Sequence, residues 1–173
     1  MKKIVILNFM LLLFATNINA QSRPEVLIDS FYNNEKILKG EITKNDLANN
    51  PAYTWYAESQ KIYPVPYAAA VEGMKKNKNN VNIVIFGGTW CEDTHFVLPK
   101  FFEMQEVSGF SEDRITIYGV DRNKHTTGTI AEDYHVIAIP TIIVMKDGKE
   151  VGRMVEYGKT GNWDKEFADI FSE

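Results

Sequence analysis

The sequence predicts a single α/β domain built on a mixed β-sheet, and two observations carry this prediction. From residue 82 onward the pattern runs strand, helix, strand, helix, strand, strand, helix. Two strands joined through a helix form a parallel pair, whereas a closing hairpin adds antiparallel strands. The chain has 173 residues, of which 45% are hydrophobic, so it can bury one sizeable core.

Each element of this core is predicted from a local pattern. The β-branched run at residues 82–86 predicts a buried strand. The later elements are predicted as a helix over 91–107, a strand over 114–120, a short helix over 129–134, strands over 141–145 and 150–155, and a helix over 162–171. Asp147-Gly148 favours a hairpin turn between the last two strands, because both residues tolerate positive φ. The result is a mixed four-stranded sheet flanked by helices.

The N-terminus has the layout of a secretory signal peptide. Lys2 and Lys3 precede an apolar stretch over residues 4–14, and a small-residue cleavage pattern ends at Ala20. We therefore expect residues 1–20 to be removed and the protein to be secreted or periplasmic.

Residues 21–80 lack the alternation of strands and helices that is predicted from residue 82 onward. Apolar residues at helical spacing after Pro24 predict an amphipathic helix, and Pro64 and Pro66 precede a second one over 67–76. The expected organisation is an N-terminal helical extension at 21–80 that joins a core at 81–173 in one compact domain.

The composition argues against several classes of function. The 19 basic and 23 acidic side chains give a net charge of −4, which provides no electrostatic footprint for nucleic acid. No apolar run after the signal peptide is long enough to span a bilayer. We expect neither a nucleic-acid partner nor membrane attachment after signal cleavage.

The chain has one cysteine, Cys91. It therefore forms no intramolecular disulfide, although export leads to a compartment where disulfides persist. A lone exported thiol is either buried and inert or reactive by design.

The residues around Cys91 form a motif. Trp90-Cys91 follows the first predicted strand, Thr94 comes three residues later, and Ile139-Pro140 precedes the strand at 141–145. This combination resembles the thioredoxin-like family, as a single-cysteine Trp-Cys-x-x-Thr member. The resemblance covers about residues 81–171. It implies a thioredoxin-like fold in which a cis-proline loop faces the active-site cysteine.

The expected chemistry centres on Cys91. A cysteine at a helix N-terminus meets unpaired N–H groups and the positive end of the helix dipole, and both favour the thiolate. Thr94 can offer its hydroxyl to the sulfur, and Trp90 is either an apolar lid or a core aromatic. The resemblance implies that Ile139 and Pro140, through a cis peptide bond, present backbone to a bound substrate.

Two departures from the family pattern affect turnover. Thr94 stands where a second cysteine would resolve a mixed disulfide, so release must come from an external thiol. Ile85 stands where thioredoxins often carry a buried acid that assists this release. The sequence leaves open whether the protein turns over as a thiol–disulfide oxidoreductase.

Three functions remain open. The favoured one is thiol–disulfide exchange through mixed disulfides between Cys91 and exported proteins or small thiols. The second is a non-catalytic peptide-binding module. The third is a metal-handling protein that uses Cys91 and His95, which share a helix face; a solvated or locally hydrogen-bonded histidine is the commoner case. We predict no cofactor and no metal site.

Overall fold

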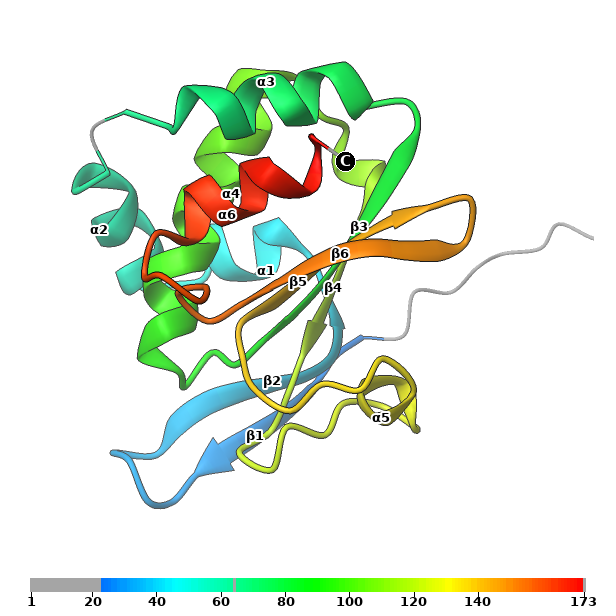
Figure 1. Cartoon of the computed structure of the whole chain (residues 1–173). Coiled ribbons are helices and arrows are strands. Elements are labelled where there is room, and N and C mark those ends of the chain that lie inside the picture. The colour runs from blue at the N-terminus through cyan, green and yellow to red at the C-terminus, as the bar shows by residue number, and fades with distance from the viewer. Residues whose placement is uncertain (1–22, 64, 173) are drawn as a thin grey trace, which may run out of the picture.

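The computed structural model describes residues 23–63 and 65–172, so the predicted signal peptide lies outside the described residues. The strands are β1 (Glu25–Asp29), β2 (Glu35–Ile42), β3 (Val81–Gly87), β4 (Ile115–Gly119), β5 (Thr141–Lys146) and β6 (Lys149–Val155). The helices are α1 (Lys44–Ala48), α2 (Trp55–Lys61), α3 (Ala68–Asn77), α4 (Glu92–Ser108), α5 (Ile130–Asp133) and α6 (Trp163–Ile170), with a 3₁₀ turn at Glu112–Arg114 before β4 (Figure 1).

The strands form one mixed sheet in the order β1-β2-β4-β3-β5-β6. The central pair β3 and β4 is parallel, and every other neighbouring pair is antiparallel. The predicted strands β3 to β6 are all present. The expectation of four strands is wrong, however, because the described part of the sheet has six.

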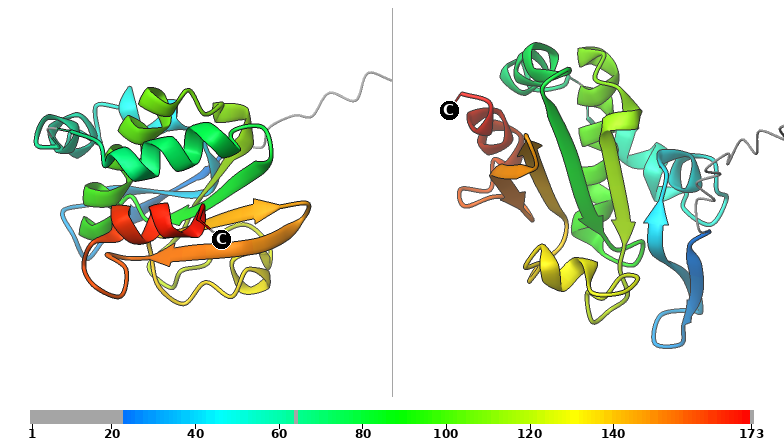
Figure 2. Two further views of the ribbon diagram at one scale, coloured as in Figure 1. Left: turned by 45° about the horizontal axis from the view of Figure 1, so that its top comes forward. Right: turned by 90° about the vertical axis from the view of Figure 1, so that its right-hand side faces the viewer.

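The two additional strands correct the expected N-terminal helix. Residues 25–42 form a β-hairpin that extends one edge of the sheet, at the opposite end from β5 and β6 (Figure 2). The turn contains Asn33 and Asn34, whose φ angles are 49° and 56°. Asparagine adopts such angles more readily than most residues, so these two reverse the chain where a helix would have continued. The extension at 21–80 is therefore helical only after residue 42.

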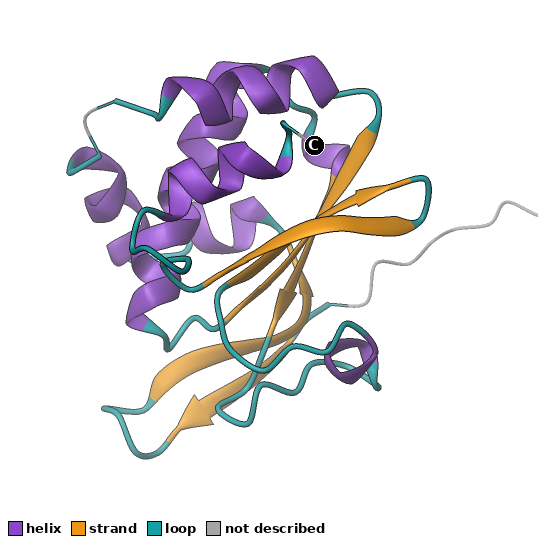
Figure 3. Cartoon of the chain, viewed as in Figure 1, coloured by secondary structure: helices purple, strands orange, loops and turns teal. Residues whose placement is uncertain are grey.

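The sheet separates two apolar clusters because successive side chains of a strand point to opposite faces. Ile83 and Ile85 lie in the larger cluster, under α3, α4 and α6. Val84 and Phe86 lie in the smaller one, with Ala131 of α5. The longer helices gather on one side of the sheet, and α5 lies alone on the other (Figure 3). The smaller cluster matters for function because Trp90 and Cys91 pack against it.

The hairpin reaches the central strands through a close backbone contact. Gly40 of β2 pairs with Gly119 of β4, and a Cβ atom on Gly119 would lie 2.3 Å from the carbonyl oxygen of Leu38. Only glycine permits this approach. The contact brings the hairpin next to the loop that carries Cys91.

The C-terminal elements agree with the sequence within a few residues. The turn between β5 and β6 uses Asp147 and Gly148 at φ angles of 51° and 74°, as the Asp-Gly signal predicts. Within the residues that the structure describes, no helix combines the length and the apolar character needed to cross a membrane.

Candidate functional site

Cys91 is the residue immediately before α4, at the end of the turn that leaves β3. Its N–H donates to the Gly88 carbonyl at 3.0 Å, and its carbonyl accepts from His95 N–H at 3.0 Å. The residue is half-buried. This is the helix N-terminal position that the sequence predicts.

The loop that contains Pro140 lies against the cysteine. The Cys91 thiol donates to the Ile139 carbonyl with a sulfur–oxygen distance of 3.7 Å, and the Ile139–Pro140 peptide bond is cis. Ile139 and Pro140 are both buried. Two segments 48 residues apart in the chain therefore meet at the sulfur.

Trp90 combines the two roles that the sequence left open. Its indole Nε1–H donates to the Val120 carbonyl at 2.9 Å, so one edge is anchored in the protein. The ring also covers Gly88 closely, because a Cβ atom there would lie 2.8 Å from the indole. The side chain is half-buried, so it presents an apolar surface beside Cys91.

The Thr94 hydroxyl does not contact the Cys91 sulfur, contrary to the expectation from the sequence. Its side chain is buried, and its hydroxyl oxygen accepts from the Gly88 N–H at 3.2 Å. Among the described residues it makes no hydrogen bond to Cys91 Sγ. The reason is geometric: the backbone at Gly88 turns toward the first turn of α4, and its N–H needs an acceptor there.

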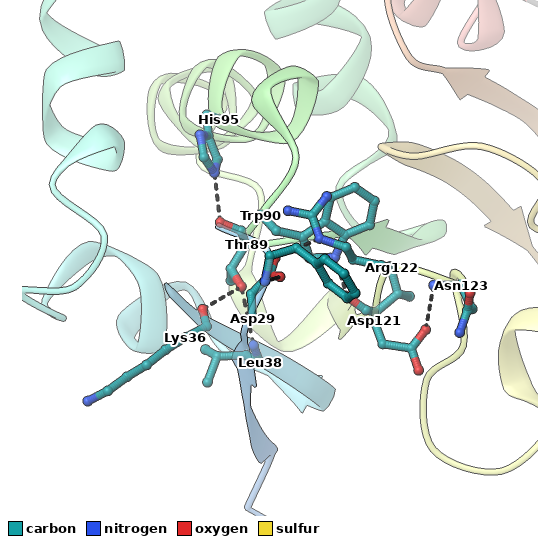
Figure 4. Close-up of polar contacts among 11 residues, drawn as sticks. Asp29, Lys36, Leu38, Thr89, Trp90, His95, Asp121, Arg122 and Asn123 are labelled. Atoms are coloured by element: carbon teal, nitrogen blue, oxygen red, sulfur yellow. Dashed lines mark hydrogen bonds and ion pairs between the residues drawn. The ribbon is translucent and has the colours of Figure 1, made fainter. Parts of the chain in front are cut away.

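The hairpin contributes to the site in a way that the sequence did not predict. Thr89, two residues before Cys91, accepts from the Leu38 N–H at 3.2 Å and donates to the Lys36 carbonyl at 3.1 Å. Beside it, Arg122 Nε donates to Asp29 Oδ2 at 2.6 Å (Figure 4). The Asp29 carboxylate is only 1% exposed, so this ion pair is largely removed from water on the aspartate side.

Arg122 also connects two aromatic rings. Its guanidinium carbon lies 4.2 Å from the centroid of the Tyr32 ring and 4.7 Å from that of the Trp90 ring. Such contacts stabilise a cation between the two rings. The hairpin, Arg122 and Trp90 are thus one connected unit, and only the Asn33-Asn34 turn signal could have indicated the hairpin from the sequence.

Neighbouring protein groups contact the His95 ring at Nε2 and on one face. Its Nε2 lies 2.7 Å from the Thr89 carbonyl oxygen, and its ring stacks on Trp55 at a centroid distance of 4.1 Å. No group of three or more His, Cys, Asp or Glu side chains able to hold a metal occurs in the described part of the chain. The metal-handling alternative therefore gains no support from the geometry around His95.

The buried surroundings of His95 lead to a pH prediction. Burial lowers the pKa of His95 below the usual 6.5. The imidazole therefore binds a proton less readily in the folded protein than in the unfolded chain. Stability should therefore fall as the pH drops below about 6.5, by at most about 1.4 kcal/mol per pH unit. Urea unfolding of wild type and His95→Gln between pH 5 and 8 tests this. The wild type should lose stability relative to the variant on acidification, and a difference independent of pH would contradict the assignment.

Tyr157 is a further neighbour of the cysteine that the sequence did not single out. It follows Glu156, whose N–H donates to the Pro140 carbonyl at 2.7 Å. Burial, a hydrogen bond to Asp93 and the nearby negative charges raise the pKa of Tyr157 to about 12. The phenol therefore stays neutral beside the carboxylates at the start of α4.

Comparison with known proteins agrees with this arrangement. The sequence profile of the family described as Thioredoxin matches residues 67–166. The chain belongs to the thioredoxin family. The match includes Cys91, Thr94 and the segment at 139–140, whereas the β1–β2 hairpin lies outside it.

Individual thioredoxins are similar to part of the chain. The Mycolicibacterium smegmatis thioredoxin is 33% identical over 73 residues, which cover 42% of this chain and 62% of that protein. Thioredoxin Y, chloroplastic, from Oryza sativa subsp. japonica is 35% identical over 82 residues, which cover 47% of this chain and 45% of that protein. A solved Pseudomonas aeruginosa protein of unknown function aligns with a TM-score of 0.48 at 15% identity, over 68% of this chain and 80% of that one. The chain thus matches about half to three fifths of the length of the first two thioredoxins.

Proposed function

We propose that this thioredoxin-family protein is an exported monothiol that exchanges disulfides through Cys91. The observation that supports the proposal most directly is the position of Cys91. A half-exposed cysteine precedes the 17-residue helix α4 and lies 3.7 Å from the backbone of the Ile139–Pro140 loop. The thiolate is the attacking form in disulfide exchange, and Cys91 occupies the position at the positive end of the α4 dipole.

The reaction needs two steps. In the first, the Cys91 thiolate attacks a disulfide of an exported protein or a small molecule, forms a mixed disulfide and releases the other sulfur as a thiolate. In the second, the thiolate of an external thiol attacks the substrate sulfur and regenerates the Cys91 thiolate. Ile139 and Pro140 bind the substrate backbone, and Trp90 supplies apolar contact.

A second candidate, a non-catalytic peptide-binding module, rests on the surroundings of the sulfur. Thr94 directs its hydroxyl oxygen to Gly88, and Ile85 is fully buried where an acid would assist release. Neither side chain helps a mixed disulfide to resolve. In this alternative the same surface binds a peptide, and Cys91 takes no part in chemistry.

Trapping at Cys91 tests the proposal. Native protein should be alkylated by iodoacetamide before unfolding, and it should form a one-to-one adduct with bis(2-hydroxyethyl) disulfide that glutathione removes. Protein purified from the periplasm or medium without reductant should carry mixed-disulfide partners and begin at Gln21. Mass spectrometry reads all of these results, with Cys91→Ser as the control. A thiol that reacts only after denaturation would favour the binding module instead.

A further inference from the structure

The tip of the β1–β2 hairpin exposes two aromatic side chains. Phe31 is 87% exposed and Tyr32 is 58% exposed. Their backbone is nevertheless fixed: the Phe31 N–H donates to Asp29 Oδ1 at 3.1 Å, and the Glu35 N–H donates to the Tyr32 carbonyl at 2.9 Å. Exposed aromatic groups on an ordered turn are typical of surfaces that bind a partner.

This tip is continuous with the surroundings of the reactive cysteine. Tyr32 and Trp90 both contact the Arg122 guanidinium, and Trp90 directly precedes Cys91. The close-up shows Asp29, Arg122 and Trp90 together, next to Thr89 (Figure 4). A polypeptide bound at Cys91 would therefore reach the hairpin tip without leaving the surface.

The same surface carries carboxylates without cationic partners. Glu35, Glu92 and Asp93 form no ion pair within the described ranges of the chain. Glu35 and Glu92 lie close enough to His95 to oppose the lowering of its pKa by burial. Glu92 and Asp93 lie close enough to Tyr157 to contribute to its raised pKa. Glu92 and Asp93 thus place negative charge directly after Cys91, and Glu35 places it near His95, four residues further along the chain.

The nearby cations do not cancel this charge. Arg122 is paired with the buried Asp29, and the Lys36 side chain extends away from His95 and Thr89 (Figure 4). Between the hairpin and α4 lies a pocket of about 250 Å³, and Glu35, Lys36, Trp55 and His95 are among its lining residues. It offers a carboxylate and an aromatic face to an entering side chain.

We propose that this surface docks a cationic polypeptide segment, in which lysine or arginine flanks the cysteine that exchanges with Cys91. Cationic side chains gain Coulomb attraction from Glu35, Glu92 and Asp93 and a cation–π contact from Phe31, because Arg122 already contacts the Tyr32 ring. The occupant is a polypeptide, whereas the same carboxylates disfavour binding of an anionic disulfide such as oxidised glutathione. This inference rests on the proposed function and specifies its substrate class.

A charge series of peptide disulfides tests the inference. Three short peptides share one sequence around a central cysteine and differ only in flanking lysine, glutamine or glutamate. For each peptide, the rate of mixed-disulfide formation with full-length protein is divided by the rate of the same peptide with free glutathione. This relative rate should be highest for the lysine peptide, intermediate for the glutamine peptide and lowest for the glutamate peptide. The lysine and glutamate peptides should differ by about tenfold or more at low salt, and about 0.5 M NaCl should reduce this difference.

Single substitutions test whether the surface next to Cys91 causes the preference for the lysine peptide. Glu35→Gln should lower the ratio of lysine to glutamate rates, whereas Glu72→Gln on the distant helix α3 should not. Phe31→Ser should slow the lysine peptide, whereas Val107→Ser, at the far end of α4 and 62% exposed, should leave it unchanged. Using the ratio of two peptides removes any change in the intrinsic reactivity of Cys91.

The outcomes separate the two proposals. Equal rates for all three peptides would overturn cationic docking and leave the exchange chemistry standing. If no peptide reacts, the exchange chemistry fails, and docking is then decided by calorimetric binding of serine-substituted peptides to the Cys91→Ser protein. A preference for the lysine peptide there supports docking, and no preference overturns it.

Discussion

Arg122→Ala is expected to lower the free energy of unfolding by about 3 kcal/mol, the lower end of the range for breaking a buried ion pair. The substitution leaves the Asp29 carboxylate, which is 1% exposed, without its cation. It also removes the group between the Tyr32 and Trp90 rings. Urea unfolding followed by circular dichroism measures the loss, and tryptophan fluorescence reports the change around Trp90.

A variant that lacks both charges separates the ion pair from the effect of side-chain volume. Asp29→Asn together with Arg122→Met removes both charges and keeps most of the volume, so this variant should be more stable than Arg122→Ala. Arg122→Lys keeps the charge but loses the planar group that stacks on both rings, so it should restore only part of the stability. An Arg122→Ala protein within about 0.5 kcal/mol of wild type, the range of ordinary surface substitutions, would show that the contact is not structural.

Thr94→Cys is expected to convert the monothiol into a dithiol. Positions 91 and 94 lie within the first turn of α4, so a thiol at 94 can attack a mixed disulfide at Cys91. Because the attack is intramolecular, insulin reduction driven by dithiothreitol should rise by about tenfold or more over wild type. The oxidised variant should also be lighter by two hydrogens, which mass spectrometry resolves.

Thr94→Ser is the matched control, because it keeps the hydroxyl that accepts from Gly88 and adds no thiol. Its insulin reduction should equal that of wild type. If Thr94→Cys forms the disulfide but is no more active than Thr94→Ser, then Ile85 is the dominant obstacle, because no buried acid assists release. If no disulfide forms at all, the assumed geometry of the first turn is wrong.

The elements around the cysteine could be predicted because their signals are local. The β-branched run of β3 and the Asp147-Gly148 turn each specify their structure within a few residues. The position of Cys91 before α4 follows from the same strand-to-helix sequence. These features needed no knowledge of distant contacts.

The hairpin and its contacts could not be predicted in this way. Apolar residues between 26 and 38 fit helical spacing, and this longer pattern outweighs the short turn signal of Asn33 and Asn34. The bond from Arg122 to Asp29 joins residues 93 positions apart, and no local pattern pairs them. The orientation of Thr94 depends on the Gly88 N–H, which only the folded turn presents.

The pairing of Gly40 with Gly119 has a consequence for chain synthesis. The hairpin is encoded before the strand that receives it, because β4 is encoded only at residues 115–119. A nascent chain thus holds the hairpin before it has the partner that fixes it beside Cys91. Ile139, Pro140 and Tyr157, which also surround the thiol, are encoded later still. The cysteine is therefore made well before the residues that enclose it.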